Sequence, residues 1–170
     1  MIRRLFCALA AVLLLCGGAN CEDMPDLVRL HVVAADNSPE AQALKLELRD
    51  TCLKCAGICL DGAPDANAAY MRLEQHLDDF RRACEDRARE LGYEGSISAQ
   101  AGVFDFPHRI YGRLSVPAGQ YRALRITIGE GEGRNWWCVL YPGLCTLDEA
   151  AMENPGSILA WLRARFGGAQ

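Results

Sequence analysis

The first strongly patterned segment of the chain, residues 27–35, is rich in apolar and β-branched side chains. In an extended conformation its even-numbered residues share one apolar face, whereas Arg29 and His31 alternate onto the other face. This pattern predicts a central β-strand. The turn that follows contains Ser38 and Pro39, an N-cap residue and a first-turn residue that together predict the start of a helix.

Two later segments have the periodicity of amphipathic helices. The apolar stripe of the first helix contains Ala41, Leu44, Leu48, Cys52, Cys55 and Cys59. Residues 61–64 include glycine and proline and end this helix, and a second, longer helix is predicted from about Asp65 to Leu91. Its stripe contains Ala69, Leu73, Leu77, Phe80, Cys84, Ala88 and Leu91. Gly92 then provides a C-terminal stop.

The rest of the domain has the composition of β-strands. The strand-like segments are residues 97–103, 109–116, 121–128 and 136–141, and turn or glycine-rich sequences separate the last three. One strand, two helices and a meander of strands predict an α/β fold. We expect a two-layer sandwich, in which two main helices pack on one face of a mixed or antiparallel sheet. Short C-terminal helices are expected in the tail.

The N-terminus has the pattern of a secretory signal peptide. Arg3 and Arg4 precede an unbroken apolar run at residues 5–15, and small residues follow up to Ala19. The run is shorter than the roughly 20 residues that a transmembrane helix needs. We therefore expect residues 1–19 to be cleaved, residues 20–148 to form the main domain and residues 149–170 to form a helical tail. An uncleaved membrane anchor is the alternative.

The charge balance argues against nucleic acid and anionic membranes as partners. The chain has 18 Lys and Arg against 22 Asp and Glu, a net charge of −4. Loss of Arg3 and Arg4 with the signal peptide leaves 16 basic residues and a net charge of −6. Both partner classes require a basic face, so we expect neither.

Nine cysteines stand in the chain, and seven remain after removal of the signal peptide. An odd number leaves at least one thiol free or paired between chains. Cys52, Cys55 and Cys59 are spaced like metal ligands, with Cys84 as a fourth candidate, but all four continue apolar helical stripes. We interpret them as core residues; a metal site and a helix-to-helix disulfide such as Cys55–Cys84 are the alternatives. No metal or other cofactor is predicted.

Sequence motifs of catalysis are missing from the chain. There is no G-x-S-x-G and no H-E-x-x-H pattern, and His31, His76 and His108 are expected to be structural or surface residues. The loop Gly129–Arg134 resembles a phosphate loop only in its glycines, because it lacks the lysine and its two glutamates would repel a phosphate. We therefore predict no catalytic residue and no small-molecule substrate.

The most unusual segment contains two adjacent tryptophans. Trp136 and Trp137 must point to opposite faces of a strand. One of them is therefore either exposed, as in interface hot spots, or covered by a helix on the second face. Cys138 and Cys145 flank a Pro-Gly turn, where a disulfide is compatible with the spacing but not required. They are also the candidate residues for the alternative function, an exported cysteine-dependent hydrolase or thiol-redox enzyme.

In this segment the chain resembles a known family, stage II sporulation protein R of endospore-forming bacteria. The most specific match is Ile128-Gly129-Glu130-Gly131-x-Gly133-x-Asn135-Trp136-Trp137-Cys138-Val139-Leu140. Weaker matches include Arg29–Ala34, Asn37–Glu40, Gln42–Lys45, Phe106-Pro107, Tyr111-Gly112 and Pro117-Ala118-Gly119. The resemblance covers about residues 26–148. Ala35-Asp36, Gly143 and Thr146 depart from the family pattern, which does not include the tail.

The resemblance implies a signalling protein. Members of the family are secreted from the forespore into the intermembrane space during sporulation, where they activate a membrane-embedded aspartic protease of the mother cell. That protease then removes the pro-sequence of a sigma factor. We expect this sporulation protease to be the partner. The expected contact surface consists of Tyr111, Glu130, Glu132, Asn135, Trp136 and Trp137.

Overall fold

The computed structural model of the protein describes residues 27–111 and 114–142. Its elements are β1 (Val28–Val33), α2 (Pro39–Cys59), α3 (Ala66–Gln75), α4 (Leu77–Glu90), β2 (Ile97–Phe106), β3 (Arg109–Tyr111), β4 (Leu114–Val116), β5 (Gly119–Ile128) and β6 (Asn135–Tyr141). The predicted signal peptide, the predicted helical tail and Cys145 lie outside the described residues. In the two described ranges, no helix is both long enough and apolar enough to cross a membrane.

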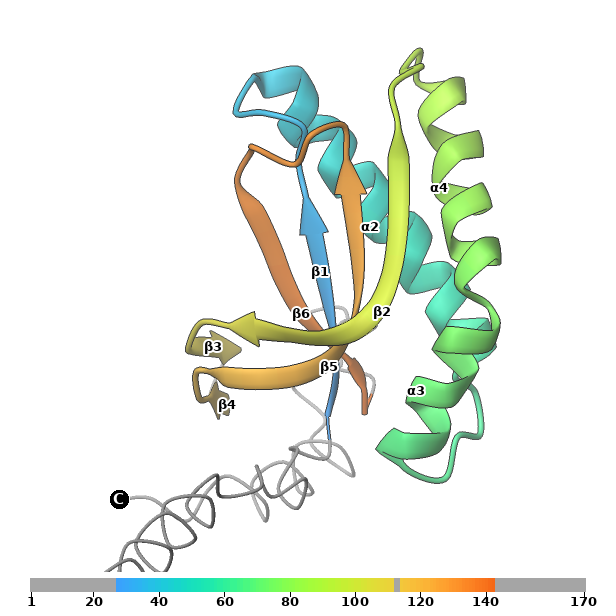
Figure 1. Ribbon diagram of the computed structural model, residues 1–170, viewed down its shortest axis with the longest axis vertical. Coiled ribbons are helices and arrows are strands. Elements are labelled where there is room, and N and C mark those ends of the chain that lie inside the picture. The colour runs from blue at the N-terminus through green and yellow to red at the C-terminus, as the bar shows by residue number, and fades with distance from the viewer. Residues whose placement is uncertain (1–26, 112–113, 143–170) are drawn as a thin grey trace, which may run out of the picture.

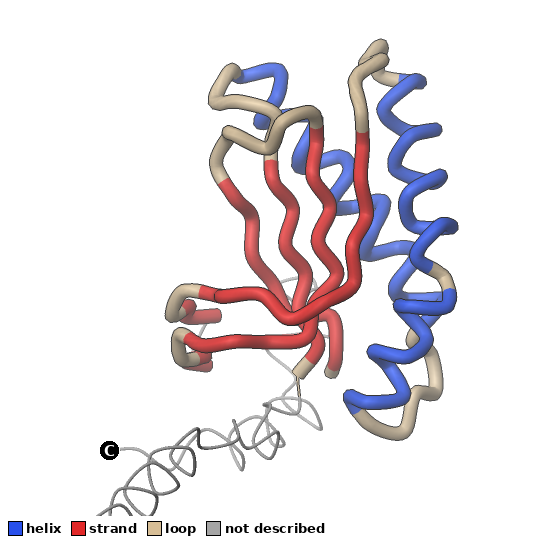
Figure 2. The backbone as a smooth tube through the Cα atoms, in the orientation of Figure 1, coloured by secondary structure: helices blue, strands red, loops and turns tan. Residues whose placement is uncertain are grey.

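Four strands form one mixed sheet in the order β2-β5-β1-β6. Strand β1 runs parallel to β5 and antiparallel to β6, and β2 runs antiparallel to β5. Helices α2, α3 and α4 cover one face of the sheet, as Figure 1 and Figure 2 show. We call the opposite face, on which no helix of the described ranges packs, the helix-free face. The predicted two-layer α/β sandwich with a central first strand is confirmed.

The strand order differs from the expected meander, because β1 lies between β5 and β6. The chain leaves β1, passes through the three helices and enters the sheet again at its far edge with β2. A parallel pair requires such a long crossover connection. The crossover therefore places both neighbours of β1 about a hundred positions further along the chain.

Two helix ends follow the local sequence signals. Ser38 caps α2, where its Oγ accepts a hydrogen bond from the backbone N–H of Ala41 at 3.2 Å, and Pro39 is the first helical residue. Helix α4 is followed by Gly92, which has a φ of 81° in the left-handed region. Both predicted signals are confirmed.

The prediction of one long helix from Asp65 to Leu91 is wrong. Helices α3 and α4 meet at His76, whose backbone is not helical. Asp78 and Asp79 then occupy the first turn of α4, where negative charge interacts favourably with the free backbone N–H groups. The Nδ1 atom of His76 also lies 2.9 Å from a carboxylate oxygen of Asp79. The sequence around the break therefore favours a new helix start.

The segment predicted as one strand, residues 109–116, forms two strands instead. Strands β3 and β4 pair antiparallel in a separate two-stranded sheet, with Arg109 opposite Val116. Figure 1 shows this hairpin beside the ends of β2 and β5 that bend away from the main sheet. Val116 joins Phe106 and Tyr121 in a small apolar cluster. The hairpin therefore shields part of the helix-free face.

The main core lies between the sheet and the helices. Leu30 and Val32 of β1 pack there with helix residues that include Leu48 of α2 and Phe80 of α4. These side chains are almost completely inaccessible to solvent. Burial of this apolar surface is the principal driving force for the fold.

Candidate functional site

Two polar residues of the central strand, Arg29 and His31, lie on the helix-free face. Their neighbours Leu30 and Val32 belong to the main core under the helices, so the alternation of a strand turns Arg29 and His31 to the other side. Both are buried, with 0% and 8% of their surface exposed. Polar side chains are rarely buried without partners, so their contacts define the candidate site.

The ring of His31 stacks on Trp137, its partner residue on β6, with 3.8 Å between the ring centroids. Its Nε2 atom lies 2.8 Å from the side-chain oxygen of Asn135. An amide oxygen only accepts hydrogen bonds, so Nε2 carries the proton and Nδ1 is the acceptor of a neutral ring. Nδ1 has no hydrogen-bond partner among the described residues. Burial lowers the pKa of His31, which favours the neutral ring.

The guanidinium of Arg29 is held by aromatic rings and a hydroxyl group. It lies 4.1 Å from the ring centroid of Phe106 and 4.9 Å from that of Tyr121. Its Nη2 donates to the hydroxyl of Tyr111 at 2.8 Å, and its Nε donates to the carbonyl of Cys138 at 3.4 Å. Burial lowers the pKa of Arg29, but arginine titrates so far above neutral pH that the side chain stays cationic. Desolvated cation–π contacts of this kind are worth about 2 kcal/mol.

Tyr111 connects the hairpin to the main sheet. Its hydroxyl accepts from the guanidinium and donates to the backbone carbonyl of Trp137 at 3.2 Å. Burial raises the pKa of Tyr111, although the neighbouring guanidinium acts in the opposite direction, so the phenol remains a neutral donor. Arg125 extends the same face, where its guanidinium lies 4.5 Å from the ring centroid of Phe104 and donates to Gln100. The helix-free face is thus lined by cations and aromatic rings.

The structure brings together three of the six residues predicted for the contact surface. Tyr111, Asn135 and Trp137 gather around the buried pair on the helix-free face. Trp136 points to the other side, where it packs against the main core and lies 5.1 Å from the guanidinium of Arg49. The prediction that the two tryptophans point to opposite faces is confirmed. Helix α2 packs on the face of Trp136, and both tryptophans remain partly exposed.

The other two predicted residues, Glu130 and Glu132, are exposed in the loop between β5 and β6. Within this loop, Gly131 has a left-handed φ of 69°. A Cβ atom on Gly133 would lie 2.1 Å from the carbonyl oxygen of Asp36. The glycines therefore allow a tight turn and a close approach to the turn between β1 and α2. That approach holds both glutamates at one end of the sheet.

Sequence analysis missed Arg29, His31 and Phe106 as members of the site. A signal for the first two was present, because two polar residues face the same side of an otherwise apolar central strand. Their partners carry no such signal. Tyr111 stands 82 positions after Arg29, and Asn135 stands 104 positions after His31. Only the three-dimensional fold brings these residues together.

The cysteines of β6 and the following turn were the candidate nucleophiles for an enzyme. Cys138 is disulfide-bonded. Its predicted partner, Cys145, lies outside the described residues, so that pairing stays a prediction. A disulfide sulfur is not a thiolate, and in this state Cys138 is not a nucleophile.

The four helical cysteines are thiols. Cys52 of α2 and Cys84 of α4 are fully buried, with their sulfur atoms 3.4 Å apart, so the prediction that they are core residues is confirmed. Cys55 and Cys59 are only half-buried. The alternative disulfide Cys55–Cys84 is wrong, because Cys84 faces Cys52 instead. Within the described ranges, no three or more His, Cys, Asp or Glu residues are grouped as a metal site would require.

The remaining two histidines lie at the surface, as predicted. His76 contacts Asp79. His108 lies 2.8 Å from the hydroxyl of Ser115 on the exposed hairpin. An activated serine needs a third group that orients the histidine ring. His108 forms no second side-chain hydrogen bond with the described residues, so this pair lacks that group.

The chemistry of the helix-free face suits the binding of a polypeptide. Trp137 offers a partly exposed aromatic ring whose orientation is fixed by stacking on His31, and the exposed Asn135 offers an amide beside it. Aromatic residues with fixed rotamers are frequent hot spots of protein interfaces. The face therefore presents an aromatic ring in a fixed orientation beside an exposed amide.

Comparison with known proteins shows the same family that the sequence motifs suggested. The chain matches the family model of Stage II sporulation protein R (spore_II_R) over residues 24–151. It is 34% identical, over 126 residues, to Stage II sporulation protein R of Bacillus subtilis (strain 168), an alignment that covers 74% of this chain and 56% of the relative. The chain thus spans little more than half the length of that relative. No solved structure matches the chain. Because the family match includes every described residue, the chain belongs to the stage II sporulation protein R family.

Proposed function

We propose that the chain is an exported signalling protein of sporulation that activates a membrane-embedded aspartic protease. In this proposal the activated protease processes the precursor of a mother-cell sigma factor. The observation that carries the proposal is the family match, which spans the complete described domain and supports a role in sporulation. The signal peptide expected in residues 1–19 and the acidic charge of the domain are consistent with a role outside the cytoplasm.

In this proposal the chain acts by binding and makes or breaks no covalent bond itself. A ligand shifts a conformational equilibrium only by its difference in affinity for the two states. The chain must therefore bind the active protease more tightly than the inactive protease. A shift from 1% to 99% active protease requires about a 10⁴-fold difference in affinity.

The helix-free face provides a rigid surface for such selective binding. Trp137 is stacked on His31, and the hydroxyl of Tyr111 is fixed between Arg29 and the β6 backbone. Side chains that are already ordered lose little conformational entropy when a partner binds. We propose that Trp137 and Asn135 contact the protease, and that the glutamates of the β5–β6 loop contact it beside them.

Reconstitution in a host that does not sporulate tests this proposal. The chain, a candidate membrane-embedded aspartic protease and the sigma-factor precursor are expressed together, and the precursor is followed by immunoblotting. We expect cleavage only when all three proteins are present and the catalytic aspartates of the protease are intact. Cleavage without the chain, or full-length precursor with all three proteins at normal levels, would contradict the proposal.

The proposed export has a separate test. The mass of the protein recovered outside the cytoplasm should correspond to a chain that begins at Asn20, because cleavage is predicted after Ala19. A folded chain with an intact amino terminus in the cytosol would contradict export.

A further inference from the structure

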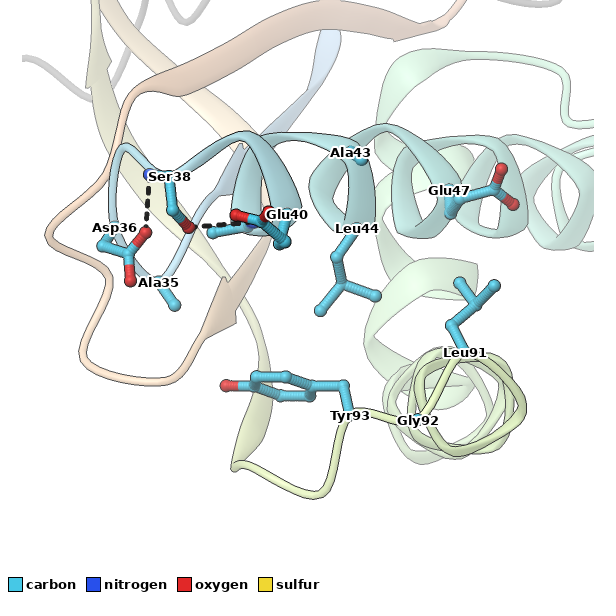
Figure 3. A pocket seen from close by; sticks show the side chains of 11 residues that line it. Ala35, Asp36, Ser38, Glu40, Ala43, Leu44, Glu47, Leu91, Gly92 and Tyr93 are labelled. Carbon is cyan, nitrogen blue, oxygen red and sulfur yellow. Dashed lines mark hydrogen bonds between the residues drawn. The ribbon is translucent and has the colours of Figure 1, made fainter.

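A groove of about 500 Å³ lies between α2 and the turn that joins α4 to β2. Figure 3 shows Leu44 of α2 pointing into it from one side, and Leu91 and Tyr93 lining the other side. Leu91 leaves 46% of its surface exposed. The volume is in the range of sites that hold a small ligand or one side chain of a partner. The floor of the groove is therefore an apolar surface that the described residues leave uncovered.

Carboxylates surround this apolar floor. Asp36 and Glu40 line the groove at the amino-terminal end of α2. Burial raises the pKa of Tyr93, and the negative charges of Asp36 and Glu130 raise it further, so Glu130 also acts on this end of the groove. Neither Glu40 nor Glu130 forms an ion pair with a described residue.

Two cations near the groove, Arg87 and Lys45, are already engaged. Arg87 donates to Glu47 at 2.7 Å and to Glu90 at 2.9 Å. The ammonium group of Lys45 is largely buried, where it donates to Gln42 and to a backbone carbonyl of the β5–β6 loop. No lysine or arginine is among the described residues that line the groove, whereas Asp36, Glu40 and Glu47 are, so its rim carries an excess of negative charge.

The groove is continuous with the loop that carries the family motif. A Cβ atom on Gly129 would lie 3.1 Å from the Tyr93 hydroxyl and 3.2 Å from the Cβ atom of Ala35, which also lines the groove. The β1–α2 turn, the β5–β6 loop and the α4–β2 turn all lie at the same end of the molecule (Figure 1). A partner that contacts Glu130 from outside is thus at the entrance of the groove.

We propose that this groove is a docking site for a basic segment of a partner protein, which inserts an apolar side chain between α2 and Tyr93. Lysine or arginine residues on either side of that apolar side chain complement Glu40, Asp36 and Glu130. This inference rests on the proposed function. It extends the surface with which this chain contacts the protease from the helix-free face, across the β5–β6 loop, to the groove. Opposite charges at the rim of an interface mainly accelerate association and select the partner.

Synthetic peptides test the chemistry of the groove directly. The probe is a fluorescein-labelled nonapeptide of alternating lysine and leucine, and the comparison is its glutamate and leucine counterpart. Binding to the full chain is measured by fluorescence anisotropy at 50 mM and 300 mM salt. We expect the basic peptide to bind at least ten-fold more tightly than the acidic peptide and to weaken at high salt, because salt screens exposed charges.

Two variants and two matched controls locate the binding. Glu40→Lys reverses a charge at the rim and Ala43→Trp fills the groove, and each should weaken binding at least five-fold. Asp61→Lys makes the same charge change beyond the opposite end of α2, about 30 Å along the helix axis. Gly57→Trp adds the same ring elsewhere on α2, at a position where an added Cβ atom would have open space within 4 Å. Both controls should bind within two-fold of the unchanged chain.

Circular dichroism verifies that each variant is folded, and Glu40→Gln replaces Glu40→Lys if charge reversal disturbs the helix. Equal weakening by Glu40→Lys and Asp61→Lys, or unchanged binding by Ala43→Trp, would overturn the groove as the docking site. In the reconstituted protease assay, normal processing by Ala43→Trp and Glu40→Lys would also overturn it, without affecting the proposed function. Groove binding without any processing would instead contradict the proposed function alone.

Discussion

The two faces of the sheet are built from different chemistry. On the helix-covered face, β1 presents Leu30 and Val32, and β5 presents Ile126; all three are apolar and inaccessible to solvent. On the helix-free face, the intervening positions of the same strand carry Arg29 and His31, which are almost as deeply buried. One strand therefore supports an apolar core on one side and a polar, aromatic cluster on the other.

We propose that this difference separates the residues that stabilise the fold from the residues that bind the partner. Apolar contacts are non-directional, so many side chains of suitable volume hold the helices on the sheet. A buried guanidinium and a buried neutral imidazole require partners in defined positions, because unpaired polar groups are costly inside a protein. Substitutions under the helices should therefore change mainly the free energy of unfolding. Substitutions on the helix-free face should change the orientation of the residues that we propose to contact the partner.

The largest expected effect is the loss of a core ring on the helix-covered face. Phe80 is 1% exposed and packs in the main core. Phe80→Ala should lower the free energy of unfolding by about 3–5 kcal/mol, through lost apolar burial and a residual cavity. Urea denaturation followed by circular dichroism measures this change. Exposed Ile58→Ala is the control, and an equal loss in both variants would contradict the assignment of the main core.

A smaller effect is expected for the buried cation on the other face. Arg29→Ala removes the packing on Phe106 and Tyr121 and leaves the Tyr111 hydroxyl without its donor. It should cost about 2–4 kcal/mol of unfolding free energy, since both packing and hydrogen bonds to a charged group are lost. Arg29→Met keeps most of the apolar stem and removes the desolvated charge, so it should cost less than the alanine variant. An equal or larger cost for Arg29→Met would contradict the described role of the stem and the rings.

The adjacent tryptophans provide a comparison within a single strand. Trp136→Ala removes a ring from the helix-covered face, where it packs against the main core and lies near Arg49. It should lower the free energy of unfolding by roughly 2–3 kcal/mol, less than a fully buried ring would. Trp137→Ala removes a partly exposed ring and should cost about 1–2 kcal/mol, because its stacking on His31 and its edge-to-face contact with Phe106 are lost. A larger stability loss for Trp137→Ala would reverse the assignment of the two faces.

The smallest expected effect is a dependence of stability on pH through His31. Burial lowers the pKa of His31 in the folded state, so the unfolded state binds the proton more readily. This contribution to stability is complete above the ordinary histidine pKa of about 6.5 and is lost as the pH falls below that value. The loss is at most about 1.4 kcal/mol for each pH unit by which the pKa of His31 in the folded state lies below its pKa in the unfolded state. Urea denaturation at pH 8.0 and pH 5.0 should show a smaller difference for His31→Gln than for the unchanged chain. Identical pH dependence in the two proteins would contradict a neutral buried His31.

Local features of the fold could be predicted from the sequence because they depend on neighbouring residues. The Ser38 cap, the stop at Gly92 and the opposite directions of Trp136 and Trp137 are of this kind. The break at His76 was missed because the apolar stripe continues through it, with Leu73 and Phe80 both buried. Periodicity alone does not distinguish one helix from two helices whose buried faces coincide.

The candidate site was predictable only in part, because its residues come from five strands, β1, β2, β3, β5 and β6. The motif around Trp137 identified β6, and the alternation of polar residues placed Arg29 and His31 on one side of β1. The insertion of β1 between β5 and β6 brings these residues into contact, and that order depends on the crossover through three helices. Phe106 reaches the cluster only because β2 bends toward the hairpin (Figure 1).

We propose that the helix-free face is the surface that the protease partner recognises. The decisive measurement is sigma-factor processing in the reconstituted host, compared between Trp137→Ala and Trp136→Ala at equal concentrations of folded chain. We expect at least a ten-fold loss of processing with Trp137→Ala and near-normal processing with Trp136→Ala. Normal processing by folded Trp137→Ala would contradict it.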